Sequence, residues 1–438
     1  MTSIPRLSRM LRKLFFAEAT ELARHHGVIQ RERVFTGASL LHLLVFGWLK
    51  NPQAGSSFLA RFAGGLGLKL SKQAIEERFT MRTADWLLAV LRRGVQYLVC
   101  AQSVSIPLLQ RFTAVLVEDG STISLPAALK QVWRGCGGSG SEAALKLTVR
   151  WDLLTGGLWG PYVQAGHRHE TQSPLREQQM PRGSLWIGDL GYFSLVWLGQ
   201  LVKQGVFFLM GYKEPVTLWD ADGKRVEVLD LLPTDGQQVV DVPVSLGAHK
   251  QVQARLIAKH MPEAVVKRRR EQLQEQAHKR CKPINPRQWE LVQWVIVLTN
   301  VPISMLSAAE AMALMRARWQ IELLWKLWKE LGAIDEWQTA NPMRILCELY
   351  AKLLGMLVQH WVLLLSCWDD PHRSLVGAAQ VIRDQVPTLV HGLLGHIPLS
   401  KALSLVKQAL SNGCSIPKRQ TRLSTSHLLL KQFDDGLT

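Results

Sequence analysis

Apolar positions recur at helical spacing over roughly the first hundred residues of the chain. Hydrophobic residues return every three or four positions in 40–49 and in 86–99, which predicts a helix in each segment. Between them, a glycine-rich break at 63–70 leads into 71–79, which begins with a serine suited to capping a helix. This arrangement is compatible with a helix-turn-helix, although any helical bundle produces the same pattern. We expect a helical N-terminal domain over residues 1–105.

The pattern changes to that of strands beyond the N-terminal helices. Residues 112–123 form an apolar run that predicts a buried strand ending in an Asp-Gly turn, and 145–164 alternate around a Thr-Gly-Gly turn, which predicts a hairpin. Short apolar runs at 184–193 and 205–212 predict two further strands, the first ending at Asp189 and followed by a helix. Hairpin-linked strands beside single buried strands and helices indicate a mixed α/β fold.

Residues 213–300 have the features of an insertion rich in strands. Alternating runs flank a turn at Asp222-Gly223, a strongly basic helical run follows, and 294–300 closes the segment as a strand. The chain is helical again after this segment. Its most apolar stretch, 353–367, is interrupted by a glutamine and a histidine and is shorter than the roughly 20 apolar residues of a membrane span, so we predict a buried helix.

Composition narrows the classes of function. With 438 residues, 47% of them hydrophobic, the chain is long enough for several domains with sizeable cores. Its net charge of +17 favours polyanionic partners, either nucleic acid or an anionic membrane surface. The six cysteines form no CxxC pair, which argues against a zinc ribbon or a redox motif and fits reduced thiols in the cytoplasm.

Two aspartates share the same sequence context. Asp119 and Asp189 each follow a buried apolar strand and precede a glycine by one or two residues. Ligands gather at the carboxyl edge of open α/β sheets. A plain turn would explain either aspartate alone, because Asp-Gly is common after a strand. The repeated context is what indicates a site.

A predicted helix over 315–331 carries a third carboxylate. At about 100° per residue, Glu322 shares one face with Met315 and three cations, while the opposite side is apolar. The cations on that face are Arg318, Lys326 and Lys329. A solvated face with ion pairs four residues apart explains the same pattern. Three carboxylates would also suffice to bind two divalent ions about 4 Å apart, the arrangement that activates the nucleophile and stabilises the leaving oxygen in phosphodiester cleavage.

Three blocks of the sequence resemble the signature blocks of DDE insertion-sequence transposases of the IS-four family. They are EDGSTISLP at 118–126, GDLGYF at 188–193 and RARWQIELLWKLWK at 316–329. The resemblance covers about 110–340, including a β-rich insertion between the second aspartate and the glutamate. The order of the three blocks makes it more specific than any single block.

The resemblance implies an RNase H-like catalytic core interrupted by the insertion. The expected domains are a DNA-binding domain at 1–105, the core at 106–212 and 301–340, the insertion at 213–300 and a helical C-terminal region at 341–438. It also implies that three catalytic residues bind two Mg²⁺ ions, for which Mn²⁺ can substitute. These residues are Asp119, Asp189 and Glu322.

The family signature Tyr-x2-Arg-x3-Glu-x6-Lys reads here Met315-x2-Arg318-x3-Glu322-x6-Lys329. The resemblance implies that Arg318 and Lys329 contact DNA phosphates near the transposon end. Lys326 is a further DNA-binding candidate on the same face. Methionine cannot donate the hydrogen bond of the family's tyrosine. End binding could be weaker for that reason, but the three carboxylates are intact.

The expected function is cut-and-paste DNA transposition and recombination. The resemblance implies a bacterial enzyme of the cytoplasm and nucleoid that binds terminal inverted repeats as a homodimer, nicks the DNA with water and joins the freed 3′-OH to target DNA, with no membrane partner. One alternative is an RNase H-like nuclease that does not join strands. Another is a non-catalytic DNA-binding protein derived from a transposase, against which the unaltered carboxylates argue.

Other residues are weaker candidates for DNA contact. Trp294, near the end of the insertion, could stack on a base flipped out of the duplex or belong to the core. The basic run 267–270 could grip DNA or lie on a solvated helix face. His167 and His169 have the spacing of metal ligands, but histidines in loops usually do not bind a metal.

Overall fold

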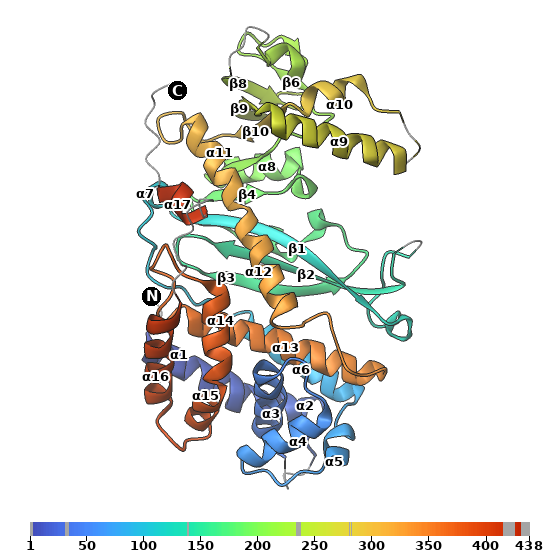
Figure 1. The fold of residues 1–438 in the computed structure, drawn as a ribbon, viewed down its shortest axis with the longest axis vertical. Coiled ribbons are helices and arrows are strands. Elements are labelled where there is room, and N and C mark those ends of the chain that lie inside the picture. The colour runs from blue at the N-terminus through green and yellow to red at the C-terminus, as the bar shows by residue number, and fades with distance from the viewer. Residues whose placement is uncertain are drawn as a thin grey trace. The chain divides into compact units, whose positions relative to one another are not determined.

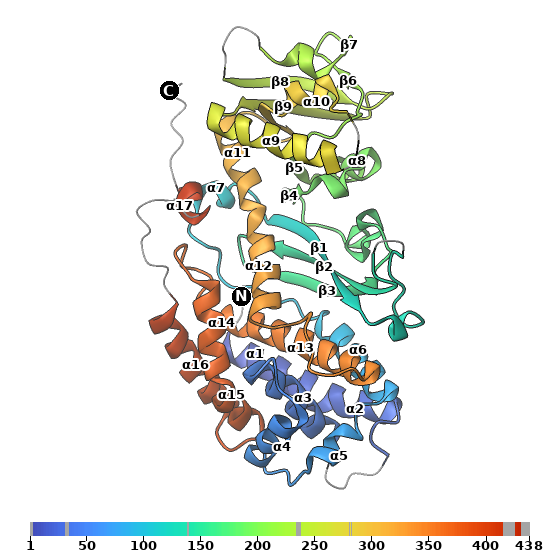
Figure 2. The ribbon, with the colours of Figure 1, turned by 45° about the vertical axis from the view of Figure 1, so that its right-hand side comes forward.

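The computed structural model describes residues 3–30, 35–137, 140–233, 238–279, 281, 283–414 and 425–430. The chain forms two compact units (Figures 1 and 2). The first unit consists of Met1–Ile106, Asp119–Leu175 and Gln320–His427. The second consists of Pro107–Glu118, Arg176–Trp319 and Leu428–Thr438.

The N-terminal part of the first unit is helical, as the periodicity predicts. Its elements are α1 (Ile4–Arg12), a π-helical turn (Lys13–Glu18), α2 (Ala19–His25), α3 (Gly37–Lys50), α4 (Ser56–Gly65), α5 (Lys72–Glu76) and α6 (Met81–Gly94). Ser71 caps α5 by accepting a hydrogen bond from the Ala74 backbone at 3.1 Å, as expected. The helix after the glycine-rich break is only five residues long, and the longer basic helix is α6.

The C-terminal helices belong to the same unit. They are α13 (Pro342–Leu363), α14 (Leu375–Asp384), α15 (Val386–Leu393) and α16 (Leu399–Gly413), and α17 (Thr425–Leu430) is the last element described. α13 packs on α3 and α6 and is buried along nearly its whole length, which confirms the predicted buried helix. The histidine that interrupts its apolar sequence, His360, pairs its Nε2 with the Gly156 carbonyl at 2.7 Å. Among the described helices, none is both long and apolar enough to cross a membrane.

The first unit also contains the predicted hairpin. Strands β2 (Ala143–Asp152) and β3 (Leu158–Ala165) pair antiparallel around Gly156. This glycine has a φ of +73°, and a Cβ there would lie 2.4 Å from the Leu364 side chain and 2.6 Å from that of Trp368. The turn therefore needs glycine both for its backbone conformation and for its packing.

The second unit is built on a mixed sheet. Its strands lie in the order β1–β4–β5–β10–β9–β8–β6–β7, with β1, β4 and β5 parallel and the remaining pairs that are described antiparallel. The strands are β1 (Val115–Leu125), of which the part up to Glu118 belongs to this unit, β4 (Leu185–Gly188), β5 (Phe207–Gly211), β6 (Leu218–Trp219), β7 (Arg225–Val226), β8 (Val239–Leu246), β9 (Val252–His260) and β10 (Trp294–Thr299). The expected mixed α/β class is confirmed. The segment predicted as an insertion continues the sheet through β10, which lies between β5 and β9.

Helices accompany these strands. They are α7 (Pro107–Gln110), α8 (Leu195–Lys203), α9 (Glu263–Lys279), α10 (Pro286–Leu291), α11 (Ala308–Ala317) and α12 (Trp319–Glu330). α8 follows β4, as predicted, and packs on β5 and β9. α9 is the basic helix expected in the inserted segment, and α12 continues from the second unit into the first.

One predicted strand end is wrong. The Asp-Gly pair at 119–120 was expected to turn the chain, but β1 continues through it to Leu125. The residues beyond Gly120 keep the alternation of a strand, because Ile123 and Leu125 are buried while Thr122 and Ser124 are exposed. That alternation overrides the local turn tendency of Asp-Gly.

Candidate active site

The two aspartates belong to neighbouring strands. β1 and β4 pair in parallel, with Glu118 in register with Gly188. Asp119 is the next residue of β1, and Asp189 comes immediately after β4. Both are half-buried, and the side chain of Asp189 is 47% exposed. Each carboxylate is thus held by a strand while remaining accessible.

The third carboxylate, Glu322, is half-buried on α12. The single helix predicted over 315–331 is wrong, because α11 ends at Ala317 and α12 begins at Trp319. The intervening Arg318 keeps helical dihedral angles, with φ −50° and ψ −36°. The interruption is therefore local, and it places the methionine of the family signature on α11 and the glutamate on α12.

Arg318 lies against the second aspartate rather than in solvent. Its Nη1 is 3.7 Å from Asp189 Oδ1, and its side chain is only 13% exposed. The separation exceeds that of a hydrogen bond, so this is a charge contact. Arg318, the first cation of the family signature, therefore lies next to Asp189, a candidate catalytic residue.

The other two cations of the predicted face have acidic neighbours on the first unit. Lys326 Nζ is 3.6 Å from Glu330 Oε1, and Lys329 Nζ is 3.9 Å from Asp335 Oδ2. The Lys326–Glu330 contact is a pair four residues apart, as the ion-pair interpretation of the helix expects, whereas Asp335 lies beyond the end of α12. Neither contact tests DNA binding by these cations. The apolar side of the helix is buried as predicted except at Leu323, which is 51% exposed, and Leu331, which is half-buried.

Trp294 is half-buried at the start of β10. Its ring packs edge-on against His260, with centroids 5.0 Å apart. Its carbonyl accepts a hydrogen bond from Arg269 Nη1 at 3.2 Å, and the same nitrogen donates to the Val292 carbonyl at 3.3 Å. Burial lowers the pKa of Arg269 below its usual range. This arginine of the basic run therefore anchors the start of β10.

The remaining basic residues of α9 face outward or line a groove. Lys267 and Arg268 are exposed. The Arg270 guanidinium lies 4.9 Å from the centroid of the Trp289 ring, and both residues line a groove of about 630 Å³. Part of the basic run is thus available to a polyanion.

The two loop histidines are used within the protein. His167 Nδ1 lies 3.1 Å from the Arg134 carbonyl. His169 Nδ1 accepts a hydrogen bond from the Thr171 backbone at 3.2 Å. Among the described residues, no group of three or more His, Cys, Asp or Glu side chains is arranged to hold a metal ion. Of the three proposed ligands, Asp119 and Glu322 belong to the first unit and Asp189 to the second.

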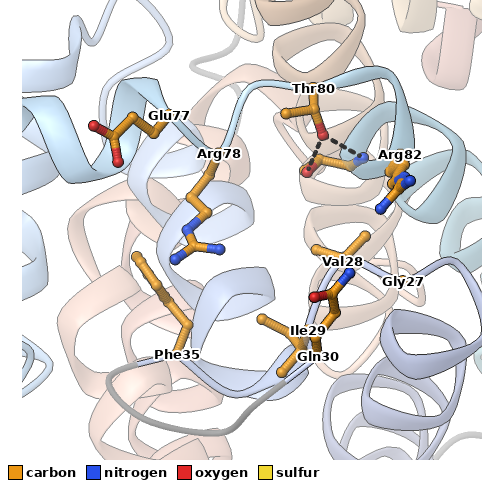
Figure 3. Close-up of a pocket in the computed structure, with 10 residues that line it drawn as sticks. Gly27, Val28, Ile29, Gln30, Phe35, Glu77, Arg78, Thr80 and Arg82 are labelled. Carbon is orange, nitrogen blue, oxygen red and sulfur yellow. Dashed lines mark hydrogen bonds between the residues drawn. The ribbon is translucent and has the colours of Figure 1, made fainter.

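Sequence reasoning missed a cationic pocket of about 570 Å³ in the first unit (Figure 3). Arg78 points into it, with its guanidinium 5.1 Å from the centroid of the Phe35 ring. The Arg78 Nε is buried and has no hydrogen-bond partner among the described residues. Arg82 and Thr80, which caps α6, add further polar groups to the wall, and Glu77 and Gln30 also line the pocket. Arg78 and Arg82, two residues before and after the capping Thr80, were the sequence signal that could have indicated this pocket.

Comparison with known proteins identifies the chain's relatives. The family model described as "Transposase DDE domain" matches residues 110–357, more than half of the chain. The transposase for insertion sequence element IS231F of Bacillus thuringiensis subsp. israelensis is 25% identical over 361 residues, covering 77% of this chain and 75% of that protein. The transposase for IS1151 of Clostridium perfringens is 23% identical over 386 residues, covering 82% and 81%. The chain therefore belongs to the DDE transposase family and is an enzyme of that kind.

Proposed function

We propose that this transposase cuts DNA at transposon ends and joins them to target DNA by a cut-and-paste route. In this proposal Asp119, Asp189 and Glu322 bind two Mg²⁺ ions, which Mn²⁺ can replace. Enzymes of the family generally use divalent metal ions. Three carboxylates supply the oxygen ligands that hard divalent cations prefer.

The register of β1 and β4 is the observation that carries the proposal. Glu118 and Gly188 are partners in parallel strands, and strands lie about 4.8 Å apart. Because successive residues of a strand point to opposite faces, the residues after this pair point to the same face. Asp119 and Asp189 are those residues. Two carboxylates directed to one face at adjacent strands are suited to sharing a cation.

The third ligand is supported by the position of Arg318. This arginine contacts Asp189, and Glu322 follows it by four residues, about one helical turn. We expect the three carboxyl groups to lie within roughly 4–8 Å of one another around a metal pair. Bound there, two divalent ions would lower the pKa of the attacking water or hydroxyl and stabilise the leaving oxygen. The chain's own cations would orient the DNA backbone.

The cationic pocket of the first unit supports DNA binding by the N-terminal region. Phosphate oxygens are the acceptors that a guanidinium binds best, and Arg78 and Arg82 both face the pocket. The net charge of +17 adds a general attraction to polyanions. We propose that this region and the α12 cations bind the terminal inverted repeats, with two copies of the chain assembled on the DNA.

The test compares DNA cleavage with DNA binding. Asp119→Asn, Asp189→Asn and Glu322→Gln should each abolish cleavage of a DNA fragment carrying the element's ends, while gel shifts show nearly unchanged binding. A carboxamide keeps the shape of the side chain but loses the charge that holds the metal. Glu330→Gln is the matched control, because this exposed residue is also on α12 but contacts Lys326.

Three results would contradict parts of the proposal. Cleavage at the wild-type rate by any one of the three variants removes that residue from the site. Cleavage by the wild-type chain without joining of a labelled 3′ end to a target plasmid favours the nuclease alternative. Binding without cleavage in Mg²⁺ and in Mn²⁺ favours the non-catalytic alternative.

A further inference from the structure

A buried hydrogen bond joins the two strands that precede the aspartates. Trp186, in β4, donates its Nε1–H to Glu118 Oε2 in β1 at 3.4 Å. Both side chains are buried, with 0% and 1% of their surfaces exposed. Leu116 is in register with Trp186 and Glu118 with Gly188, so the tryptophan and the glutamate share a face as diagonal neighbours. The bond therefore spans the strand pair just before its candidate catalytic residues.

Gly188 makes this contact possible. A Cβ at this position would lie 2.1 Å from Cη2 of Trp186 and 2.6 Å from its Cζ3. The indole thus passes over the glycine on its way to Glu118. The glycine immediately before Asp189 is required by packing rather than by a left-handed backbone, and any other residue would displace the ring.

Neighbouring aromatic rings hold the indole in place. Tyr192 and Trp197 contact the Trp186 ring edge-on, with centroid separations of 6.4 and 6.1 Å. All three rings are buried. An indole confined in this way has few alternative rotamers, so its hydrogen bond is directed at one acceptor.

We propose that Glu118 and Trp186 are positioning residues that fix the spacing between Asp119 and Asp189. The inference rests on the proposed function. Glu118 itself points away from the catalytic face, because it precedes Asp119 in a strand and alternate residues face opposite sides. The hydrogen bond resists sliding of β1 against β4, and such sliding would change the separation of the two carboxylates. The pair acts through the aspartates and touches neither metal nor DNA.

The size of the effect follows from how metal ligands are supported. Removing a group that orients metal ligands typically costs about 10–100-fold in metal affinity or activity. Trp186→Phe retains a buried ring but loses the donor, and Glu118→Ala loses the acceptor. We expect each to weaken Mn²⁺ binding about tenfold. Glu118→Gln keeps an acceptor oxygen and should stay within about threefold of the wild type, since a neutral acceptor forms a weaker bond than a carboxylate.

The experiment titrates the full chain with Mn²⁺ alone and follows the free ion by electron paramagnetic resonance. Trp151→Phe is the matched control. Trp151 is as buried as Trp186, its Nε1 has no hydrogen-bond partner among the described residues, and its ring packs on His360 and Trp368, so this substitution removes a buried indole without removing the bond to Glu118. Thermal unfolding of each variant records the change in stability. The expected result is weakened Mn²⁺ binding in Trp186→Phe but not in Trp151→Phe, with partial retention in Glu118→Gln.

The outcomes separate this inference from the function on which it rests. Equal Mn²⁺ affinity in the two tryptophan variants, or a loss of stability with unchanged Mn²⁺ affinity, overturns the positioning role alone. Wild-type Mn²⁺ binding that survives Asp189→Asn overturns the proposed metal site and the positioning role with it. A loss in Glu118→Gln as large as in Glu118→Ala overturns the hydrogen bond as the cause.

Discussion

A buried lysine of α13 stabilises the turn that follows α12, the helix that carries Glu322, and replacing this lysine should destabilise the fold. Lys352 of α13 donates to the carbonyls of Ala333 at 2.8 Å and Glu336 at 2.7 Å. Its Nζ also lies 2.8 Å from Glu348 Oε1, and both side chains are 1% exposed. Ala333 has a φ of +44°, an uncommon conformation that these contacts help to hold. The ammonium thus ties the chain following α12 to the helical core.

Lys352→Met should lower the free energy of unfolding by about 3–5 kcal/mol, the usual cost of breaking a buried ion pair by removing one partner. The loss has two sources. Glu348 is left without its counter-charge, and the two carbonyls lose a donor at roughly 1–3 kcal/mol each. Replacing both members, in Glu348→Met/Lys352→Met, removes the first source and keeps the second. The double variant should therefore be more stable than Lys352→Met.

The loss should also depend on pH. Burial raises the pKa of Glu348 above its usual range, and Lys352 opposes this shift. Without the lysine the pKa rises further, so the protonated form is favoured in the fold. A carboxyl whose pKa is higher in the folded than in the unfolded state loses stability as pH rises through the folded value. Lys352→Met should consequently be less destabilised at pH 5 than at pH 8.

Urea unfolding, followed by the fluorescence of the tryptophans, measures these differences at both pH values. A cost of less than about 1 kcal/mol for Lys352→Met, the range of an exposed pair, would contradict a structural role for this lysine. Equal stability of the single and double variants at pH 8 would also contradict it, because the uncompensated charge of Glu348 would then contribute nothing.

The remaining predictions concern DNA contact. Lys329→Ala should weaken binding to end DNA and reduce the slope of log affinity against log salt by about 0.9, which corresponds to one phosphate contact. Unchanged affinity and slope, with slightly lower thermal stability, would mean that the lysine only pairs with Asp335. Met315→Tyr should tighten end binding or raise cleavage in parallel gel-shift and cleavage assays, because it restores the donor of the family signature. Arg82→Ala should weaken DNA binding in a fluorescence anisotropy titration, whereas Arg92→Ala, at an exposed position near the other end of α6, should not. Equal losses of affinity in the two variants would exclude the pocket as a DNA-binding site.

The sequence is sufficient to predict elements whose pattern is periodic. The β2–β3 hairpin, the buried α13 and the buried strands before the aspartates were all accessible from apolar runs, alternation and turn residues. The continuation of β1 beyond Asp119 was not, because a local Asp-Gly signal competes with a pairing partner that lies elsewhere in the chain. The interruption at Arg318 also lacks a local signal, since neither glycine nor proline lies near it in the sequence.

The residues that position the site could not be predicted from the sequence, for a different reason. The carboxylates could be found because metal-dependent phosphoryl chemistry demands them in any fold. The hydrogen bond from Trp186 to Glu118 depends on the register of two strands, and the contacts of Lys352 depend on how α13 meets the end of α12. Register and packing are properties of the assembled core, so the residue type alone does not reveal these roles.

Arg318 shows how a contact within the protein can be reconciled with a role in DNA binding. Its charge contact with Asp189 is 3.7 Å long, and the aspartate side chain is 47% exposed. Because the two atoms are farther apart than in a hydrogen bond and the aspartate stays half-exposed, this pair is weaker than a buried, hydrogen-bonded one. Charge-assisted hydrogen bonds to phosphate are shorter and roughly twice as strong as neutral ones. The ion pair is therefore a small obstacle to phosphate binding. A divalent cation at Asp189 would repel the guanidinium and favour its transfer to DNA, so this ion pair is compatible with phosphate binding by the arginine.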